Sequence, residues 1–184
     1  MAFGRPRKLF TEAELYDYAV GALARRMRSV AELKRLLRNR VEAETEFGKT
    51  LVELIIVRLK DQGYLNDAKF AAAFSSYRRD NEKFGRRRVV TDLKIKGVHA
   101  EVIEKAVSSV YDEVKEESLA RAYIRRKRLQ PPKGKEDRKQ AAKVFRQLMG
   151  AGFESKTIFK ILRKWDVDEE SLSELENETS DREG

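Results

Sequence analysis

Between Gly63 and Val98 the chain reads GYLNDAKFAAAFSSYRRDNEKFGRRRVVTDLKIKGV, a run that contains two helices and the joints on either side. Gly63 suits the position just after a helix, because glycine adopts a left-handed backbone without a Cβ penalty. Asn66 or Asp67 can cap the next helix by accepting a backbone N–H. We expect that helix to bury one stripe of side chains, made of Phe70, Ala73, Phe74 and Tyr77.

A second helix is predicted immediately after the first. Gly85 is expected to break the first helix, Arg86 to Lys96 to form the next, and Gly97 to end it. The joint between the two helices is therefore rich in arginine, since Arg86, Arg87 and Arg88 follow Gly85 directly.

This pattern recurs along the chain. The run Leu93-x3-Gly97-Val98-x4-Ile103-x3-Val107 matches Leu148-x3-Gly152-Phe153-x4-Ile158-x3-Leu162 at a spacing of 55 residues. The preceding helices also correspond, because Phe70-x3-Phe74 matches Leu119-x3-Tyr123 at a spacing of 49. A repeat of about 50 residues is typical of stacked helical units that share a core. The chain is therefore predicted to be all-α, an elongated tandem array of three three-helix units resembling helix-turn-helix repeats.

Caps, apolar periods and breaks predict the remaining helices. Thr11 and Ser29 each open a capping box, and a polar insert at 42–49 precedes a helix at 51–60. Later helices are expected near 100–110, 113–129, 135–149 and 154–165, with two prolines at 131 and 132 interrupting the last unit. The predicted boundaries are repeat 1 at 11–62, repeat 2 at 63–111, repeat 3 at 112–165 and an acidic, disordered tail at 166–184.

Charge is distributed unevenly along the chain. The 184 residues carry a net charge of +9, but residues 166–184 hold nine acids against one base. The remainder therefore has a net charge of +17, which favours a polyanionic partner such as a nucleic acid or an acidic protein surface. The simpler alternative is that Lys and Arg only solvate exposed helix faces. The acidic tail either screens the basic body or only aids solubility.

Several classes of protein are excluded or disfavoured. The absence of cysteine excludes disulfides and thiolate metal sites. No apolar run approaches the roughly 18 residues of a membrane span, and the N-terminus has no signal-peptide core, so a soluble cytoplasmic protein is expected.

Catalytic signals are weak. His99 is the only histidine, and it follows Gly97 and Val98, where it opens a helix more readily than it ligates a metal. The run Phe47-Gly48-Lys49-Thr50 resembles the end of a phosphate-binding loop, but Ala43 stands where that loop needs a glycine. Paired carboxylates such as Glu116 and Glu117 lie at exposed helix ends. We therefore expect no enzyme activity, no cofactor and no metal site.

Three basic clusters are the stronger signal, each near the joint between the first and second helices of its repeat. Cations near helix C-termini are also favoured by the helix dipole, so each cluster alone has a simple explanation. Three equivalent clusters would line one edge of the array. If they made roughly six to ten phosphate contacts, the affinity would fall about 10³–10⁵-fold between low and moderate salt. The candidate partner-binding or nucleic-acid-binding residues are Arg25, Arg26, Arg28, Lys34, Arg35, Arg38, Arg78, Arg79, Arg86, Arg87, Arg88, Arg125, Arg126 and Arg128.

These residues resemble the RecX family, the bacterial regulators of the RecA recombinase. The family typically shows Gly-Tyr-Leu-(Asp/Asn)-Asp followed by Phe-Ala, an aromatic residue and Arg, and then Gly-x-x-Arg-(Ile/Val) and Lys-Gly-(Ile/Val). This chain has Gly63-Tyr64-Leu65-Asn66-Asp67, Phe70-Ala71, Phe74, Arg78, Gly85-x-x-Arg88-Val89 and Lys96-Gly97-Val98. The likeness covers about residues 15–165. The insert at 42–49 and the acidic tail depart from the family pattern.

The resemblance implies three tandem three-helix units that bind within the groove of the RecA–single-stranded DNA filament. Family members limit filament growth, and so reduce ATP hydrolysis, strand exchange and co-protease activity. The implied partners are the RecA filament and single-stranded DNA, and a monomer is expected. A basic helical DNA-binding protein that acts independently of the recombinase is the alternative. The side chains interpreted as core are Tyr64, Leu65, Phe70 and Phe74, and the preferred partner contacts are Arg86, Arg87 and Arg88 with Arg25, Arg26 and Arg28.

Overall fold

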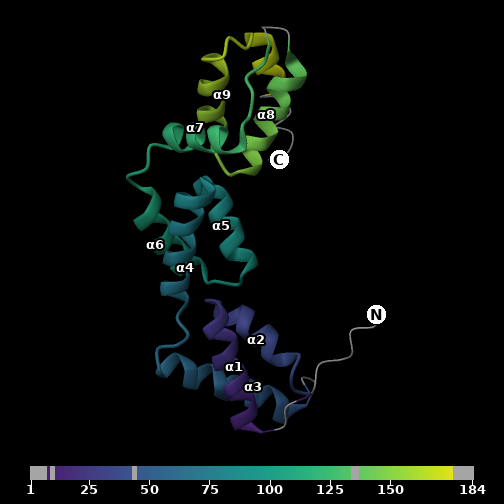
Figure 1. The fold of residues 1–184 in the computed structure, drawn as a ribbon, viewed down its shortest axis with the longest axis vertical. Coiled ribbons are helices and arrows are strands. Elements are labelled where there is room, and N and C mark those ends of the chain that lie inside the picture. The colour runs from purple at the N-terminus through teal and green to yellow at the C-terminus, as the bar shows by residue number, and fades with distance from the viewer. Residues whose placement is uncertain (1–7, 9–10, 43–44, 134–136, 176–184) are drawn as a thin grey trace. The chain divides into compact units, whose positions relative to one another are not determined.

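The computed structural model describes residues 8, 11–42, 45–133 and 137–175, and the regular secondary structure among them is helical, with no strand. This confirms the predicted all-α class. The helices, shown in Figure 1, are α1 (Glu12–Arg25), α2 (Val30–Arg38), α3 (Glu46–Asp61), α4 (Asp67–Tyr77), a π-helical turn η1 (Arg78–Glu82), α5 (Arg86–Ile95), α6 (Ala100–Tyr111), α7 (Glu116–Lys127), α8 (Arg138–Gly150) and α9 (Ser155–Arg163).

By compactness the chain divides into two units. The N-terminal unit comprises Met1–Ala73 and Leu93–Ala106, and the C-terminal unit comprises Phe74–Asp92 and Val107–Gly184. Helices α4, α5 and α6 each contribute residues to both units. The division into three repeats therefore stays a prediction.

In the N-terminal unit, α1, α2 and α3 pack against one another around a fully buried aliphatic core. That core is formed by Leu15, Ala19, Leu33, Leu37, Ile55 and Leu59. The predicted caps are present, because Thr11 accepts the N–H of Glu14 and Ser29 forms a complete capping box with Glu32. Gly63 has a φ of 75° just beyond α3, as expected for a residue that ends a helix.

Helix α3 begins earlier than predicted. The hydroxyl of Thr45 accepts the N–H of Gly48, so Glu46 to Lys49 form the first turn of α3. The prediction of a helix starting at Leu51 was therefore wrong, because a threonine cap outweighs the polar character of this segment. Of the predicted insert, residues 43 and 44 lie outside the described residues.

Helix α4 buries a different face from the predicted one. Asn66 caps it by accepting the N–H of Lys69, and Phe70 is buried as expected. Ala71 and Ser75, four residues apart, are fully buried, whereas Ala73 is exposed and Tyr77 is 57% exposed. The buried stripe of α4 therefore runs through Ala71 and Ser75, and not through Ala73 and Tyr77. The core assignment was also wrong for Tyr64, which is 64% exposed, and right for Leu65.

The helical segment formed by α4 and the turn η1 ends at Lys83, two residues before Gly85. After the π-helical turn η1, Lys83 adopts the left-handed backbone with a φ of 60°, so the turn does not depend on Gly85 as a helix breaker. Gly85 is instead required for a close approach in the C-terminal unit. Its N–H donates to the carbonyl of Ala151 at 2.8 Å, and a Cβ at Gly85 would collide with the carbonyl of Gly152.

The C-terminal unit is built around α7, α8 and α9, and α9 packs against both of the others (Figure 1). The rings of Phe145 and Phe159 stack at 5.3 Å, and Tyr123 meets Phe153 edge-on at 5.8 Å. The predicted correspondence of the glycines is confirmed. Gly97 and Gly152 have φ values of 72° and 89°, and each is followed by an apolar residue whose N–H returns to the preceding helix.

The segment that follows α9 differs from the prediction of a disordered tail starting at residue 166. Residues 169–175 are helical, and Leu172 and Leu175 are buried, as is Val167. Two leucines three residues apart place an apolar edge on a short acidic helix, and that edge joins the core of the unit. Residues 176–184, the rest of the predicted tail, lie outside the described residues.

Candidate interaction surfaces

Three of the predicted binding arginines make extensive contacts within the C-terminal unit. Arg78 forms ion pairs with Glu82 at 3.1 Å and with Asp92 at 3.0 Å. Its guanidinium also lies over the rings of Phe74 and Phe84, at 4.9 and 5.2 Å. The side chain of Asp92 is only 9% exposed and is balanced by Arg78 and Arg88. Arg78 therefore stabilises the fold, since a buried carboxylate that loses its partner is costly.

Arg79 and Arg86 connect segments that are distant in sequence. Arg79 donates to the carbonyl of Val110 at 2.8 Å and pairs with Asp80. The hydrogen bond from Arg79 to the Asp80 carboxylate lowers the pKa of Asp80. Arg86 bonds both Asp112 and Ser108 at 2.9 Å, so it joins the start of α5 to the end of α6. The predicted cluster of Arg86, Arg87 and Arg88 is thus divided between one structural arginine and its more exposed neighbours.

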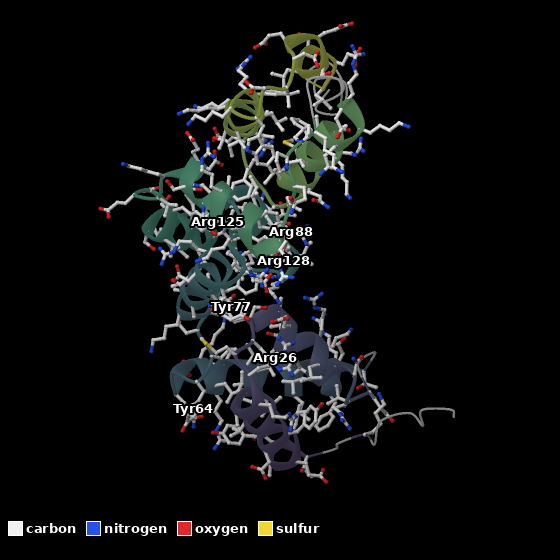
Figure 2. All side chains as sticks on the ribbon, turned by 45° about the horizontal axis from the view of Figure 1, so that its top comes forward. Arg26, Tyr64, Tyr77, Arg88, Arg125 and Arg128 are labelled. Atoms are coloured by element: carbon white, nitrogen blue, oxygen red, sulfur yellow. The ribbon has the colours of Figure 1, made fainter. Side chains whose placement is uncertain are left out.

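Five exposed arginines of the C-terminal unit lie at the start of α5 and at the end of α7. We call this group the α5–α7 arginines, namely Arg87, Arg88, Arg125, Arg126 and Arg128. The side chains of the last three make no ion pair or hydrogen bond with any residue that the structure describes. Arg88, Arg125 and Arg128 are labelled in Figure 2.

One of these arginines, Arg88, lies beside a pair of aromatic rings. Burial raises the pKa of Tyr123, and the positive charges of Arg126 and Arg88 act in the opposite direction. Arg88 also lies 5.8 Å from the centre of Phe84, whose ring is 6.1 Å from that of Tyr123. Arg88, at the start of α5, thus lies beside an aromatic pair whose second ring, Tyr123, belongs to α7.

The predicted binding residues of the N-terminal unit also fall into two groups, those with a partner within the unit and those without one. Lys34 pairs with Glu53 at 2.7 Å, and Arg28 donates to the carbonyl of Ala22 at 3.3 Å. Arg25 and Arg38 are exposed and have no side-chain partner in the part of the chain that the structure describes. Three cations, Arg26, Arg28 and Arg35, line a shallow hollow with the exposed side chain of Ile95 and with Lys96 (Figure 2 labels Arg26).

One carboxylate fixes part of this hollow. Burial alone would raise the pKa of Glu32, but hydrogen bonds from the Lys96 ammonium and the Ser29 N–H outweigh it, so the pKa is lowered. Lys96 bonds Glu32 at 3.0 Å, and Arg26 lies 3.5 Å from the same oxygen. Arg28 and Arg35 therefore carry most of the remaining positive charge around the hollow.

The residues considered as catalytic candidates lie at helix starts, and the two glutamates among them hold helices together. His99 is exposed, and its carbonyl accepts the N–H of Ile103 at the start of α6. Glu116 accepts the N–H of Glu154 and the hydroxyl of Thr157, so it caps α9 from the start of α7. Glu117 is held by Arg121, Lys160 and Lys164. Outside the gaps in the description, no three His, Asp or Glu side chains gather as a metal site would require.

Sequence reasoning missed the acids that separate structural from exposed arginines. Asp92 follows Arg88 by four residues, a helical spacing that indicates a pair, but its contact with Arg78 spans fourteen residues and has no local signal. The contact between Arg86 and Asp112 spans twenty-six residues and is equally invisible in the sequence.

Within the described residues, no helix combines the length and apolar character of a membrane span.

The fold and these surfaces define a basic, all-helical protein whose exposed arginines gather at helix ends. Residues 66–107 match the family model described as "RecX, second three-helix domain". Regulatory protein RecX of Myxococcus xanthus is 34% identical over 134 residues, which cover 69% of this chain and 71% of that protein. Regulatory protein RecX of Leptothrix cholodnii is 32% identical over 163 residues, covering 89% and 93%. The chain belongs to the RecX family.

Solved structures agree on the fold. The crystal structure of RecX from Lactobacillus salivarius matches with a TM-score of 0.62 and 21% identity, over 84% of this chain and 96% of that one. A second structure, titled "Crystal structure of regulatory protein RecX", matches with a TM-score of 0.61 and 24% identity, over 83% of this chain and 71% of that one. The matched family domain overlaps the predicted repeat 2 at 63–111.

Proposed function

We propose that this protein is a non-enzymatic inhibitor of the RecA recombinase. It binds along the groove of the RecA–single-stranded DNA filament as a cytoplasmic monomer. It thereby limits filament growth, ATP hydrolysis, strand exchange and co-protease activity. The relatives' name, regulatory protein RecX, supports a regulatory role. The observation that carries the proposal on this chain is the set of exposed arginines that have no acidic partner among the described residues, Arg125, Arg126 and Arg128 above all.

Unpartnered arginines at a helix end are suited to a polyanion. An arginine already paired with a carboxylate must break that pair before it can bind a phosphate, whereas Arg125, Arg126 and Arg128 need break none. Guanidinium groups also contact phosphates and carboxylates with two parallel hydrogen bonds, so they suit both the DNA and an acidic protein surface in the filament. The ring of Phe84, whose centre is 5.8 Å from the Arg88 guanidinium, limits how far that side chain moves.

The test is the ATPase activity of RecA on single-stranded DNA with this protein titrated at substoichiometric and stoichiometric ratios. We expect the wild-type protein to inhibit, and the variant Arg125→Glu, Arg126→Glu, Arg128→Glu to lose at least tenfold in inhibitory potency, about 1.4 kcal/mol. Arg86 is left unchanged because its bonds to Asp112 and Ser108 hold the fold.

A matched control changes the same amount of charge elsewhere. Lys60, Lys105 and Lys143 are exposed and lie outside the predicted site, so their joint substitution by Glu should leave inhibition within about threefold of wild type. Circular dichroism checks that both variants keep their helices. Undiminished inhibition by the folded arginine variant would remove Arg125, Arg126 and Arg128 from the interface.

The alternative is a DNA-binding protein that acts independently of the recombinase, and the net charge of +17 outside the last nineteen residues favours it. It requires tight, steeply salt-dependent binding to bare single-stranded DNA. Weak binding at about 150 mM salt, together with strong inhibition of the RecA ATPase, would decide for the filament inhibitor.

A further inference from the structure

Helix α8 presents a cationic face in the C-terminal unit. Arg138, Lys139 and Arg146 line one hollow, and Arg138 and Arg146 are eight residues apart, which places them on the same side of the helix. The small side chain of Ala142 lies between them. The opposite wall of the hollow is formed by Ser171, Glu174 and Leu175 from the segment after α9. A basic helix face is therefore bordered by an acidic segment of the same chain.

This acidic segment, residues 168–175, is held in place by contacts that do not involve its outer carboxylates. Asp168 accepts both the N–H and the hydroxyl of Ser171 at 2.8 Å, which caps the short helix. Leu172 and Leu175 are 2% and 5% exposed and anchor it in the core. Glu170 and Glu174 can therefore exchange partners without release of the segment.

The two outer carboxylates converge on one arginine. Glu170 lies 3.0 Å from Arg138 and Glu174 lies 3.1 Å from it, and the two charges, that of Glu174 foremost, raise the pKa of Arg138. The side chains are 46% exposed at Arg138, 75% at Glu170 and 57% at Glu174. Exposed pairs of this kind are weak, so a competing anion can displace the carboxylates.

We propose that residues 168–175 act as an internal anion that covers the cationic face of α8 and competes with the backbone phosphates of a nucleic acid for it. The proposal rests on the proposed function only in taking a nucleic acid as the external anion. When phosphates replace the carboxylates of Glu170 and Glu174, Arg138, Lys139 and Arg146 become available together. The acidic segment thus sets the strength of binding at this face and discriminates against sparse or isolated anions.

The experiment removes the competing charges but keeps the segment. The variant Glu170→Gln, Glu174→Gln retains Leu172 and Leu175, and its affinity for a labelled single-stranded oligonucleotide is measured by fluorescence anisotropy at about 50 mM salt. Loss of two exposed ion pairs should tighten binding by about three- to tenfold. The slope of log affinity against log salt should become steeper by about 0.7, the value for one additional phosphate contact on a single strand.

The matched control is Glu101→Gln, Glu113→Gln, which removes the same number of charges outside both α8 and the acidic segment. Glu101 and Glu113 are both exposed. We expect this control to bind within about twofold of wild type, because screening weakens distant charges. An equal gain in both variants would mean that only net charge matters, and would overturn the proposal.

A third variant identifies the cation involved. Arg138→Gln should have little effect in the wild-type background, where Arg138 is already occupied, but should abolish the gain in the Glu170→Gln, Glu174→Gln background. A gain that persists without Arg138 would overturn the proposal, as would unchanged affinity in the glutamine variant. These measurements contain no RecA, so they stand or fall separately from the inhibition assay.

Discussion

Gly85 and Gly152 meet backbone to backbone where α5 begins and α8 ends. The N–H groups of Gly85 and Arg87 donate to the carbonyls of Ala151 and Gly152, at 2.8 and 3.3 Å. A Cβ at Gly85 would strike the backbone of Gly152, which no side-chain rotation relieves. We therefore predict that Gly85→Ala lowers the free energy of unfolding by about 1–3 kcal/mol, the range for overpacked sites.

Gly21 provides the control for this prediction. It lies inside α1, and a Cβ there would meet nothing within 4 Å. Gly21→Ala should stabilise the protein by about 0.5–1 kcal/mol, because alanine favours the helix. Denaturant unfolding measures both values. Equal stability of Gly85→Ala and wild type would contradict the close approach.

Glu117 gives a prediction about pH. Hydrogen bonds from Lys164, Lys160 and Arg121 lower its pKa from an ordinary 4.5 to about 2. A carboxyl with a depressed pKa in the folded state stabilises the protein above its ordinary pKa, and the stabilisation is lost as pH falls through the folded value. The melting temperature of wild type should therefore exceed that of Glu117→Gln at pH 7, and the difference should shrink between about pH 4.5 and 2.

The control for Glu117 is Glu113→Gln, at an exposed acid that has no ion-pair partner in the described part of the chain. Its melting temperature should follow that of wild type throughout. High salt should reduce the effect at Glu117, because its partners Lys160 and Lys164 are exposed. A difference between wild type and Glu117→Gln that is constant over this pH range would show that the three cations do not act on its charge.

At the scale of single residues, the sequence shows where basic residues cluster, but it does not show which of them are bound to acids within the fold. Arg78 and Arg125 both precede further arginines in basic clusters, yet Arg78 is tied to Asp92 and Glu82 and Arg125 has no described side-chain partner. The difference depends on contacts between segments far apart in the chain. Tyr77 shows the same limit, since its helical spacing indicated burial and its position at the end of α4 leaves it exposed.

At the scale of elements, the short helix at 169–175 is the clearest departure from the prediction. Its composition is that of a solvated tail, but Leu172 and Leu175 are buried in the core. We predict that Leu172→Ala lowers the free energy of unfolding by about 2–5 kcal/mol, the range for buried leucines. Leu54→Ala, at a leucine that is 46% exposed, should change it by about 0.5 kcal/mol or less.

Chemical denaturation compares the two variants directly. If Leu172→Ala is as stable as Leu54→Ala, the segment does not belong to the core, and its acids are not held beside α8. The test thus also examines the anchor on which competition at Arg138 depends.

Helix ends were predicted best where a specific residue determines them. Ser29, Gly63 and Gly97 mark their boundaries through a capping box or a positive φ, and the structure confirms all three. Boundaries were missed where a common residue takes an unusual role. Lys83 ends a π-helical turn in the left-handed conformation, and Thr45 starts α3 within a segment that is otherwise polar.

At the scale of the whole molecule, the all-α class and the family were predictable because periodic apolar residues and two glycine motifs recur together. The division into compact units was not, because α4, α5 and α6 contribute to both units and no local pattern encodes such sharing. The charge of the protein was likewise predictable only in part. The totals are fixed by the sequence, but which cations face solvent depends on acids brought in by the fold, such as Asp92 and Asp112.

The bonds from Gly85 and Arg87 to the end of α8 have a consequence for how such a protein can be divided or recombined. A fragment that stops near residue 112, where the sequence repeat suggests a natural cut, would remove the acceptors of both N–H groups. Exchange of repeat 2 between relatives would succeed only with partners that keep a glycine on each side of this contact. We therefore expect the predicted repeats 2 and 3 to depend on each other for stability at this contact.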